Sequence, residues 1–200
     1  MILFFDTETS AIADFDKRAS DPSQPHLVQL AAILTTDTGD VMESHNVIIK
    51  PEGWTIPQDV IDIHGITNEI AAQWGIPEAR AISLLWSMIE KSKLIVAHNF
   101  TFDKFVARIA ARRFGLLTDD KDAWWKALPG FCTMRETTAL CNLPGKFAGR
   151  PKWPKLTEAY QHIFGKSFDG AHDALADVTA CKEVYFWLKN RPAAESAGAK

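Results

Sequence analysis

Two carboxylates stand two residues apart in the segment FDTET, as Asp6 and Glu8. The apolar, β-prone residues 2–5 before them predict a short buried strand that ends at Asp6. Side chains two apart on a strand point to the same face of its sheet, so the two carboxylates would lie side by side. Because like charges repel each other, such a pair is a candidate ligand set for one or two divalent cations. A solvated strand end is the commoner reason for this pattern when it occurs alone.

A third carboxylate follows another apolar run, in the segment AHNFTFD at residues 97–103. Here a predicted strand ends and a helix begins, and either Asn99 or Thr101 could cap that helix. Asp103 would then lie in the first turn, near the positive end of the helix dipole. An ordinary acidic first-turn residue gives the same pattern, so this segment indicates chemistry only together with the others.

The segment AHDALAD, residues 171–177, adds a histidine and a fourth carboxylate. His172 and Asp177 would point in different directions if both were helical, because five residues turn a helix by about 140°. They can converge if His172 lies in the loop that enters the helix, and Gly170 permits an irregular backbone there. A surface histidine near an exposed helical acid is the alternative.

Together these segments resemble the motifs of the DEDDh branch of the DnaQ-like 3′→5′ exonucleases. FDTET at 5–9 resembles the first motif, HNFTFD at 98–103 the second and HDALAD at 172–177 the third, and IHGIT at 63–67 resembles a recurrent segment between the first two. The resemblance implies an α/β, RNase H-like fold, with a mixed five-stranded sheet flanked by helices. It also implies a single exonuclease domain over residues 1–190.

The resemblance assigns a role to each motif residue. Four acids match the family's metal ligands: Asp6, Glu8, Asp103 and Asp177. His172 matches the general base and completes the five predicted catalytic residues. Four further residues lie where the family contacts the terminal nucleotide or shapes its site: Thr7, Thr9, Asn99 and Phe102. The implied cofactors are two divalent cations, Mg²⁺ or Mn²⁺, for which carboxylate oxygens are suitable ligands. The implied reaction is two-metal-ion hydrolysis to nucleoside 5′-monophosphates.

Hydrophobic periodicity predicts the elements that would hold these residues. Residues 2–5, 27–35 and 41–49 predict an antiparallel meander, with a fourth strand at 94–97 and a short fifth at 131–132. Helices are predicted over residues 77–92, 102–114, 134–141, 156–164 and 174–188, and short helical turns within the loop 51–75. This order favours an α/β sandwich with a mixed sheet. The small, polar tail 191–200 is expected to be disordered.

Two of the remaining segments are predicted as loops without an assigned role. Residues 11–25 form a longer loop than is usual after the family's first motif, which leaves their part in substrate choice open. Residues 118–130 are predicted as a charged loop, in which Trp124 and Trp125 are expected to pack in the core.

The loop 143–155 combines aromatic and basic residues. It holds Phe147 and Trp153 among four cationic side chains, a combination typical of surfaces that bind single-stranded nucleic acid. The alternative is a solvated loop with its aromatic side chains packed into the core.

Composition narrows the class of protein. A hydrophobic fraction of 46% and a charged fraction of 24% are those of a soluble folded domain. The sequence contains no apolar run long enough to span a membrane and no basic leader of a signal peptide at its amino terminus. Three cysteines, without the paired spacing of a zinc site, are expected to be reduced, which fits a cytoplasmic protein.

The charge is distributed unevenly along the chain. Residues 1–103 hold six Lys and Arg against fifteen Asp and Glu, whereas residues 104–191 hold fifteen against nine. This asymmetry would suit an acidic metal centre beside a basic surface for phosphates, although a chance partition gives the same numbers.

The expected ligand is the 3′ end of a single-stranded nucleic acid, with DNA favoured and RNA possible. Proofreading, repair and RNA processing by a 3′ exoribonuclease are all open as roles, and so is action beside a polymerase or another replication or repair protein. The competing functions are a non-catalytic nucleic-acid-binding protein on the same fold and a metal-dependent hydrolase of small phosphate esters.

Overall fold

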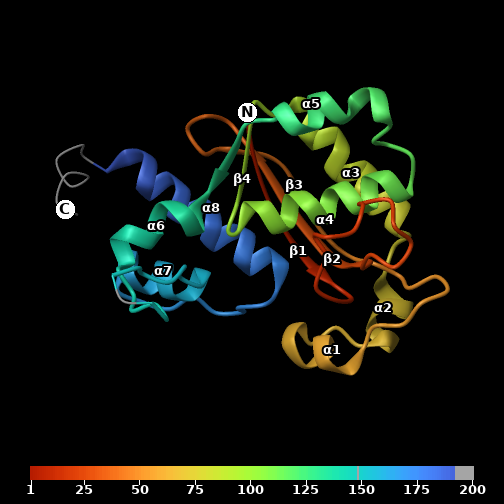
Figure 1. Ribbon diagram of the computed structural model, residues 1–200, viewed down its shortest axis with the longest axis horizontal. Coiled ribbons are helices and arrows are strands. Elements are labelled where there is room, and N and C mark those ends of the chain that lie inside the picture. Colours follow the sequence, from red (N-terminus) through yellow and green to blue (C-terminus); the bar gives the residue numbers. More distant parts are fainter. Residues whose placement is uncertain (148, 192–200) are drawn as a thin grey trace.

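A five-stranded mixed sheet forms the centre of the protein in the computed structural model, which describes residues 1–147 and 149–191. The strands are β1 (Ile2–Thr9), β2 (Leu27–Thr35), β3 (Val41–Ile48), β4 (Leu94–Ala97) and β5 (Gly130–Cys132). Their order across the sheet is β3-β2-β1-β4-β5, with β1, β2 and β3 antiparallel and β4 and β5 parallel to β1 (Figure 1). The expected fold class and mixed sheet are therefore confirmed.

Helices cover the sheet and connect its strands. They are α1 (Gln58–His64), α2 (Asn68–Trp74), α3 (Glu78–Lys91), α4 (Phe100–Arg113), α5 (Asp122–Ala127), α6 (Thr133–Cys141), α7 (Leu156–Phe164) and α8 (Ala174–Asn190), with a short 3₁₀ helix at Asp119–Lys121. Within the described part of the chain, no helix is both long and apolar enough to cross a lipid bilayer.

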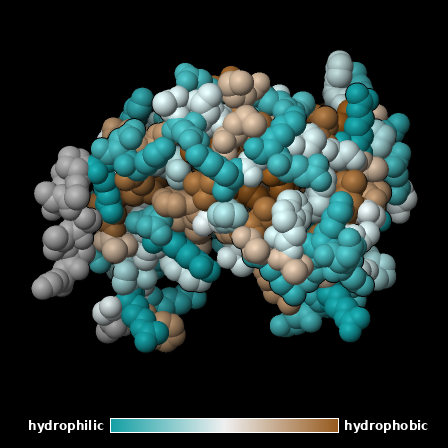
Figure 2. All heavy atoms as spheres, turned by 90° about the horizontal axis from the view of Figure 1, so that it is seen from above, coloured by the Kyte–Doolittle hydropathy of each residue, from teal (hydrophilic) through white to brown (hydrophobic). Residues whose placement is uncertain are grey.

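Alternation along β1 divides the core between the two faces of the sheet. Leu3 and Phe5 pack with α3 and α4, whereas Ile2 and Phe4 pack with α7 and α8. The two helical layers lie on opposite sides of the strands in Figure 1. On the face seen in Figure 2, hydrophobic atoms lie mainly in hollows between hydrophilic side chains. Side chains alternate between the two faces along β1, so these core residues determine the face to which each later side chain of the strand points.

The two neighbours of β1 pair with it over different lengths. The antiparallel partner β2 follows β1 from Ile2 to Thr9, with a bulge between Glu8 and Thr9. The parallel partner β4 pairs only with Ile2, Leu3 and Phe4. Among the residues that the structure describes, the carboxyl-terminal half of β1 therefore has a strand partner on one side only, and its other edge carries no strand.

Two predicted boundaries and one predicted loop were wrong. The strand β1 continues past Asp6 to Thr9, because pairing with β2 holds the polar residues in an extended conformation. The helix α4 begins at Phe100 instead of residue 102. Residues 118–130 are largely helical, since they contain the 3₁₀ helix and α5. The tail 192–200 lies outside the described residues, so its predicted disorder stays a prediction.

Tertiary contacts explain why the charged segment 118–130 is helical. Trp125 is 2% exposed and stacks on Trp86 of α3, with ring centroids 5.6 Å apart. Asp122 accepts hydrogen bonds from Arg108 and Arg112 of α4. The expected core packing is thus confirmed for Trp125 but was wrong for Trp124, which is 39% exposed and lies with its ring tilted against Trp86, at 5.5 Å between centroids.

The long loop 11–25 is anchored by hydrogen bonds. The buried amide of Gln24 accepts from the Asp14 backbone N–H at 3.1 Å and donates to the Asp14 carbonyl at 2.7 Å. At the end of the loop, buried Glu78 of α3 contacts His26 at 2.7 Å and accepts from Arg113 at 3.0 Å. Arg113 also donates to the carbonyls of Gln24 and Pro25, which ties the loop to α4.

Candidate active site

All five predicted catalytic residues line one cleft of about 400 Å³, at the open edge of β1. The cleft is formed by β1, the amino-terminal turn of α4, the start of α7 and the loop that enters α8. Its lining residues are Asp6, Thr7, Glu8, His98, Asn99, Phe102, Asp103, Lys155, Leu156, Thr157, Ala171, His172 and Asp177. Residues far apart in the sequence are thus brought together as the motifs predicted.

Asp6 and Glu8 share the face of β1 that is covered by α8, because they continue the alternation of Ile2 and Phe4. Burial raises the pKa of Asp6, and the carboxylates of Asp103 and Asp177 raise it further. Burial, followed by the same two carboxylates, raises the pKa of Glu8 to about 8. Four carboxylates in one partly buried place are costly while each is negative, unless a cation compensates them.

Asp103 reaches the site from the opposite layer. It lies in the first turn of α4, is 3% exposed, and accepts two hydrogen bonds at Oδ1 from Thr7, one from the backbone N–H at 3.2 Å and one from the hydroxyl at 2.9 Å. Burial raises the pKa of Asp103 to about 7, although the bonds from Thr7 act in the opposite direction. Thr7 points toward α4 because its parity on β1 is that of Leu3 and Phe5.

The turn that starts α4 differs from the prediction. Asn99 occupies the cap position with a left-handed backbone, φ 67°, and makes no capping hydrogen bond through its side chain. Thr101 lies inside the helix, so it is not the cap either. Asparagine tolerates left-handed backbone better than most residues, which explains its use at this turn better than capping does.

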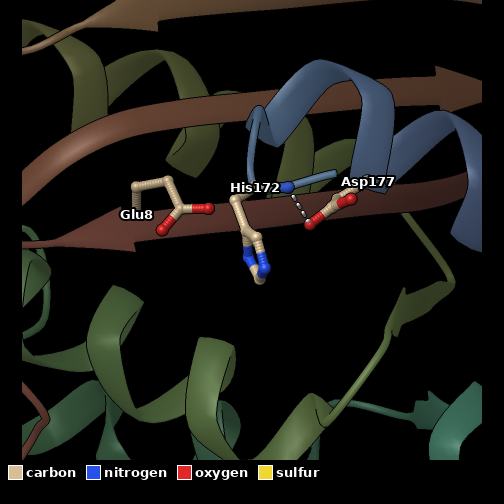
Figure 3. Close-up of side chains that lie close together, drawn as sticks. All are labelled: Glu8, His172 and Asp177. Carbon is tan, nitrogen blue, oxygen red and sulfur yellow. Dashed lines mark hydrogen bonds between the residues drawn. The ribbon is translucent and has the colours of Figure 1, made fainter. Parts of the chain in front are cut away.

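His172 lies in the loop before α8, as its spacing from Asp177 required. Its backbone is left-handed, with φ 72°, and Gly170 two residues earlier has φ 78°. The backbone N–H of His172 donates to Asp177 Oδ2 at 3.3 Å (Figure 3). Figure 3 also shows the imidazole ring pointing away from this loop into open space, with Glu8 on one side and Asp177 on the other.

Three of these side chains are close enough to share one ion. Ligand atoms of Glu8, His172 and Asp177 all lie within 4.8 Å of one another. Asp177 Oδ1 is buried and has no hydrogen-bond partner, which is costly for a carboxylate unless something binds it. Carboxylate oxygen donors, raised carboxyl pKa values and an unpartnered buried oxygen together fit a divalent metal cation.

The four predicted substrate-contact residues are not equivalent in the structure. Thr7, Asn99 and Phe102 line the cleft. Thr9 is not among the lining residues, and its hydroxyl donates to the Ala11 carbonyl at 2.7 Å. Whether these residues contact a nucleotide stays a prediction, and the hydroxyl of Thr9 is already used within its own turn.

Sequence reasoning missed the link between His98 and the loop 143–155. The imidazole of His98 lies 2.9 Å from the Thr133 hydroxyl and 3.0 Å from the Pro154 carbonyl. A carbonyl only accepts, so Nε2 carries the proton toward Pro154 and Nδ1 accepts from Thr133. Burial lowers the pKa of His98 to about 4, which keeps the ring neutral. A histidine at a strand end gives no sequence signal for this contact.

His98 thereby holds the end of the loop 143–155 against the cleft. Lys155, the next residue after Pro154, is itself a lining residue. Phe147 and Trp153 are 75% and 63% exposed, so the alternative that these aromatic side chains pack into the core was wrong. Two large aromatic side chains and several cations therefore lie in solvent, on a loop that ends at the candidate site.

Known exonucleases share this fold. A model of the RNase T family, described as an exonuclease, matches residues 3–185. Exonuclease I of E. coli in complex with a dT13 oligonucleotide superposes with a TM-score of 0.74 at 24% identity, and its complex with a dA16 oligonucleotide with 0.73 at 26%. A zinc-bound form of the same enzyme with single-stranded DNA gives 0.73 at 24%.

These structural matches cover 95% of this chain, but the chain spans only about 41% of the length of Exonuclease I. A comparison with curated protein sequences gives no significant match.

Proposed function

The chain belongs to the RNase T exonuclease family, and from this membership we propose that it removes nucleotides from the 3′ end of single-stranded DNA, releasing nucleoside 5′-monophosphates. One observation carries the proposal, namely the convergence of acids from β1, α4 and α8 with His172 in one cleft. The oligonucleotide complexes of Exonuclease I support single-stranded DNA as the substrate class.

Asp6, Glu8, Asp103 and Asp177 would hold divalent cations in this cleft. When bound, such ions acidify a water molecule and stabilise charge that develops on phosphate oxygens. The unpartnered oxygen of Asp177 and the raised carboxyl pKa values support these ligands, since a cation would satisfy both. The proposed ions are two, Mg²⁺ or Mn²⁺.

His172 would accept the proton of the attacking water. Its ring points into the cleft beside Glu8, and imidazole is the side chain best suited to proton transfer close to neutral pH. The left-handed backbone of His172 and its N–H bond to Asp177 hold the loop while leaving the ring free. After attack, the phosphodiester bond to the 3′ oxygen breaks and the terminal nucleotide leaves with its 5′ phosphate.

The loop 143–155 would guide the strand to this centre. Its cations offer sites for phosphates, although Lys152 already pairs with Glu158 at 2.6 Å. Exposed Phe147 and Trp153 offer faces on which bases can stack. Through Pro154 the loop is joined to His98, the first residue of the second motif.

The test is an end-labelled assay. The protein is incubated with 5′-labelled single-stranded DNA and RNA, with Mg²⁺, with Mn²⁺ or with chelator. The expected result is a ladder of DNA products shortened from the 3′ end that requires the metal, and the Asp177→Asn variant should lose it while keeping its thermal unfolding transition. Binding without products would favour the non-catalytic alternative, and a ladder on RNA alone would favour a 3′ exoribonuclease.

A further inference from the structure

A buried amide on β2 connects the candidate centre to the start of α8. Gln29 is 3% exposed and lies opposite Glu8 in the antiparallel register of β1 and β2. Residues directly opposite each other in an antiparallel pair point to the same face, so the side chain of Gln29 lies on the α8 side of the sheet. The sequence pattern assigns Gln29 no role, because it is an isolated polar residue within the apolar run of β2.

The oxygen and the nitrogen of the Gln29 amide both form hydrogen bonds at the first turn of α8. Gln29 Oε1 accepts from the Ala174 backbone N–H at 3.2 Å, and Nε2 donates to Asp173 Oδ2 at 3.0 Å. Nε2 also donates to Asn46 Oδ1 on β3, at 3.0 Å. The amide therefore fixes α8 relative to β1 at the point between His172 and Asp177.

Asp173 joins this contact to the rest of the turn. Its Oδ1 caps α8 by accepting from the N–H groups of Leu175 and Ala176, at 3.0 and 3.1 Å. Its Oδ2 remains for Gln29. The two oxygens have different roles, because one orders the helix start and the other ties that start to the sheet.

We propose that Gln29 is a positioning residue for the active centre, which sets the separation between Glu8 on β1 and the pair His172 and Asp177 at the start of α8. This inference rests on the proposed function for its catalytic consequence. Its structural part, the fixing of α8 by Gln29, does not depend on activity. Hydrogen-bonded partners behind metal ligands commonly affect metal affinity or rate by about 10- to 100-fold, which is the effect expected here.

The donor and acceptor of the bond between Gln29 and Asp173 can be exchanged in a double variant that keeps the net charge of the protein. In Gln29→Glu, a carboxylate faces Asp173 Oδ2, so two acceptors repel each other. In Asp173→Asn, the cap oxygen is kept but an NH₂ group faces Gln29 Nε2, so two donors meet. In the double variant, the amide introduced at position 173 donates to the carboxylate introduced at position 29, and the bond is restored in reverse. Exposed Asn46 can rotate its own amide to donate as well.

The first measurement is amide hydrogen exchange at residues 174–176 of the metal-free protein. Each single variant should accelerate exchange at Ala174 roughly tenfold, the scale of one hydrogen bond, and the double variant should restore protection. Gln24→Glu is the matched control, since it alters another buried amide whose hydrogen bonds lie within the loop 11–25. It should leave exchange at Ala174 unchanged.

The second experiment measures two quantities, the affinity for Mn²⁺ and the rate at which nucleotides are released. Each single variant should weaken Mn²⁺ binding and lower kcat by about 10- to 100-fold with little change in KM, and the double variant should recover most of both. Wild-type exchange at Ala174 in both single variants would overturn the proposal. So would altered exchange with unchanged Mn²⁺ affinity. Absence of exonuclease activity in the wild type would instead refute the proposed function, while exchange and Mn²⁺ affinity would still test Gln29.

Discussion

Thr7 gives two hydrogen bonds to a single oxygen of Asp103, so the central strand itself orients a carboxylate that belongs to α4. The backbone bond persists whatever residue stands at position 7, whereas the hydroxyl bond depends on threonine. This difference separates the part of the contact that mutation can remove from the part that it cannot.

Thr7→Val should weaken Mn²⁺ binding roughly tenfold, because Asp103 loses one of the bonds that favour its ionised form. Thr9→Val is the control, since the hydroxyl of Thr9 donates to the Ala11 carbonyl. Isothermal titration of both variants with Mn²⁺ checks the prediction. Equal affinities would mean that the Thr7 hydroxyl does not support the site.

His172→Asn should lower kcat by about 10²- to 10⁴-fold, the usual contribution of a positioned proton acceptor. Asparagine tolerates the left-handed backbone at this position, so the loop should keep its conformation. Mn²⁺ affinity should change little if His172 accepts a proton. A loss of affinity in proportion to the rate would instead identify the ring as a cation ligand.

The metal-free protein should lose thermal stability as the pH rises from about 6.5 to about 8. A carboxyl with a raised pKa in the folded state stabilises the fold at low pH, and this stabilisation is lost as the pH rises through the folded pKa, about 7 for Asp103 and about 8 for Glu8. The lowered pKa of His98, about 4, acts in the opposite direction but only below the unfolded value of 6.5.

Mg²⁺ or Mn²⁺ should therefore raise the Tm more at about pH 8 than at about pH 6.5. Glu8→Gln should reduce both the pH slope and the response to metal, whereas Glu52→Gln, which removes the same charge from an exposed loop, should change neither. Thermal scans at the two pH values with and without metal provide the measurement. A metal-free Tm that rises between them would contradict the assignment of the raised pKa values.

Trp153→Ala and Phe147→Ala should each raise KM for single-stranded oligonucleotides about 5- to 150-fold, because a stacked base contributes about 1–3 kcal/mol. kcat should be unchanged, since the loop lies outside the group of acids. Trp74→Ala is a suitable control, because Trp74 is 68% exposed but lies on α2. Equal KM values for all three variants would show that the strand does not pass over the loop 143–155.

Local patterns were sufficient to predict the motif geometry. Alternation along β1 predicted that Asp6 and Glu8 share a face, and helical rotation predicted that His172 must lie outside α8 to meet Asp177. Both results depend only on a few neighbouring residues, whose conformation the sequence pattern indicates. The five-stranded mixed sheet followed from the order of elements and from the resemblance of the motifs.

Contacts between distant segments could not be predicted in this way. Gln29 and Ala174 are 145 residues apart, and no periodicity marks either as a partner of the other. The segment that forms α5 was predicted as a loop because it is highly charged. It is helical because Arg108 and Arg112 bind Asp122, and because Trp125 stacks on Trp86. Such contacts depend on how the layers of the fold pack together, which local sequence patterns do not indicate.

The early end of the pairing between β4 and β1 has an evolutionary consequence. Since the pairing of β4 with β1 ends at Phe4, the open edge beside Asp6 and Glu8 is set by two strands in the interior. Neither acid belongs to the surrounding loops 11–25 and 143–155, so the position of the acids does not depend directly on the length of these loops. In a lineage that keeps these strand lengths, the acidic centre can be inherited unchanged while the surface segments around it diverge.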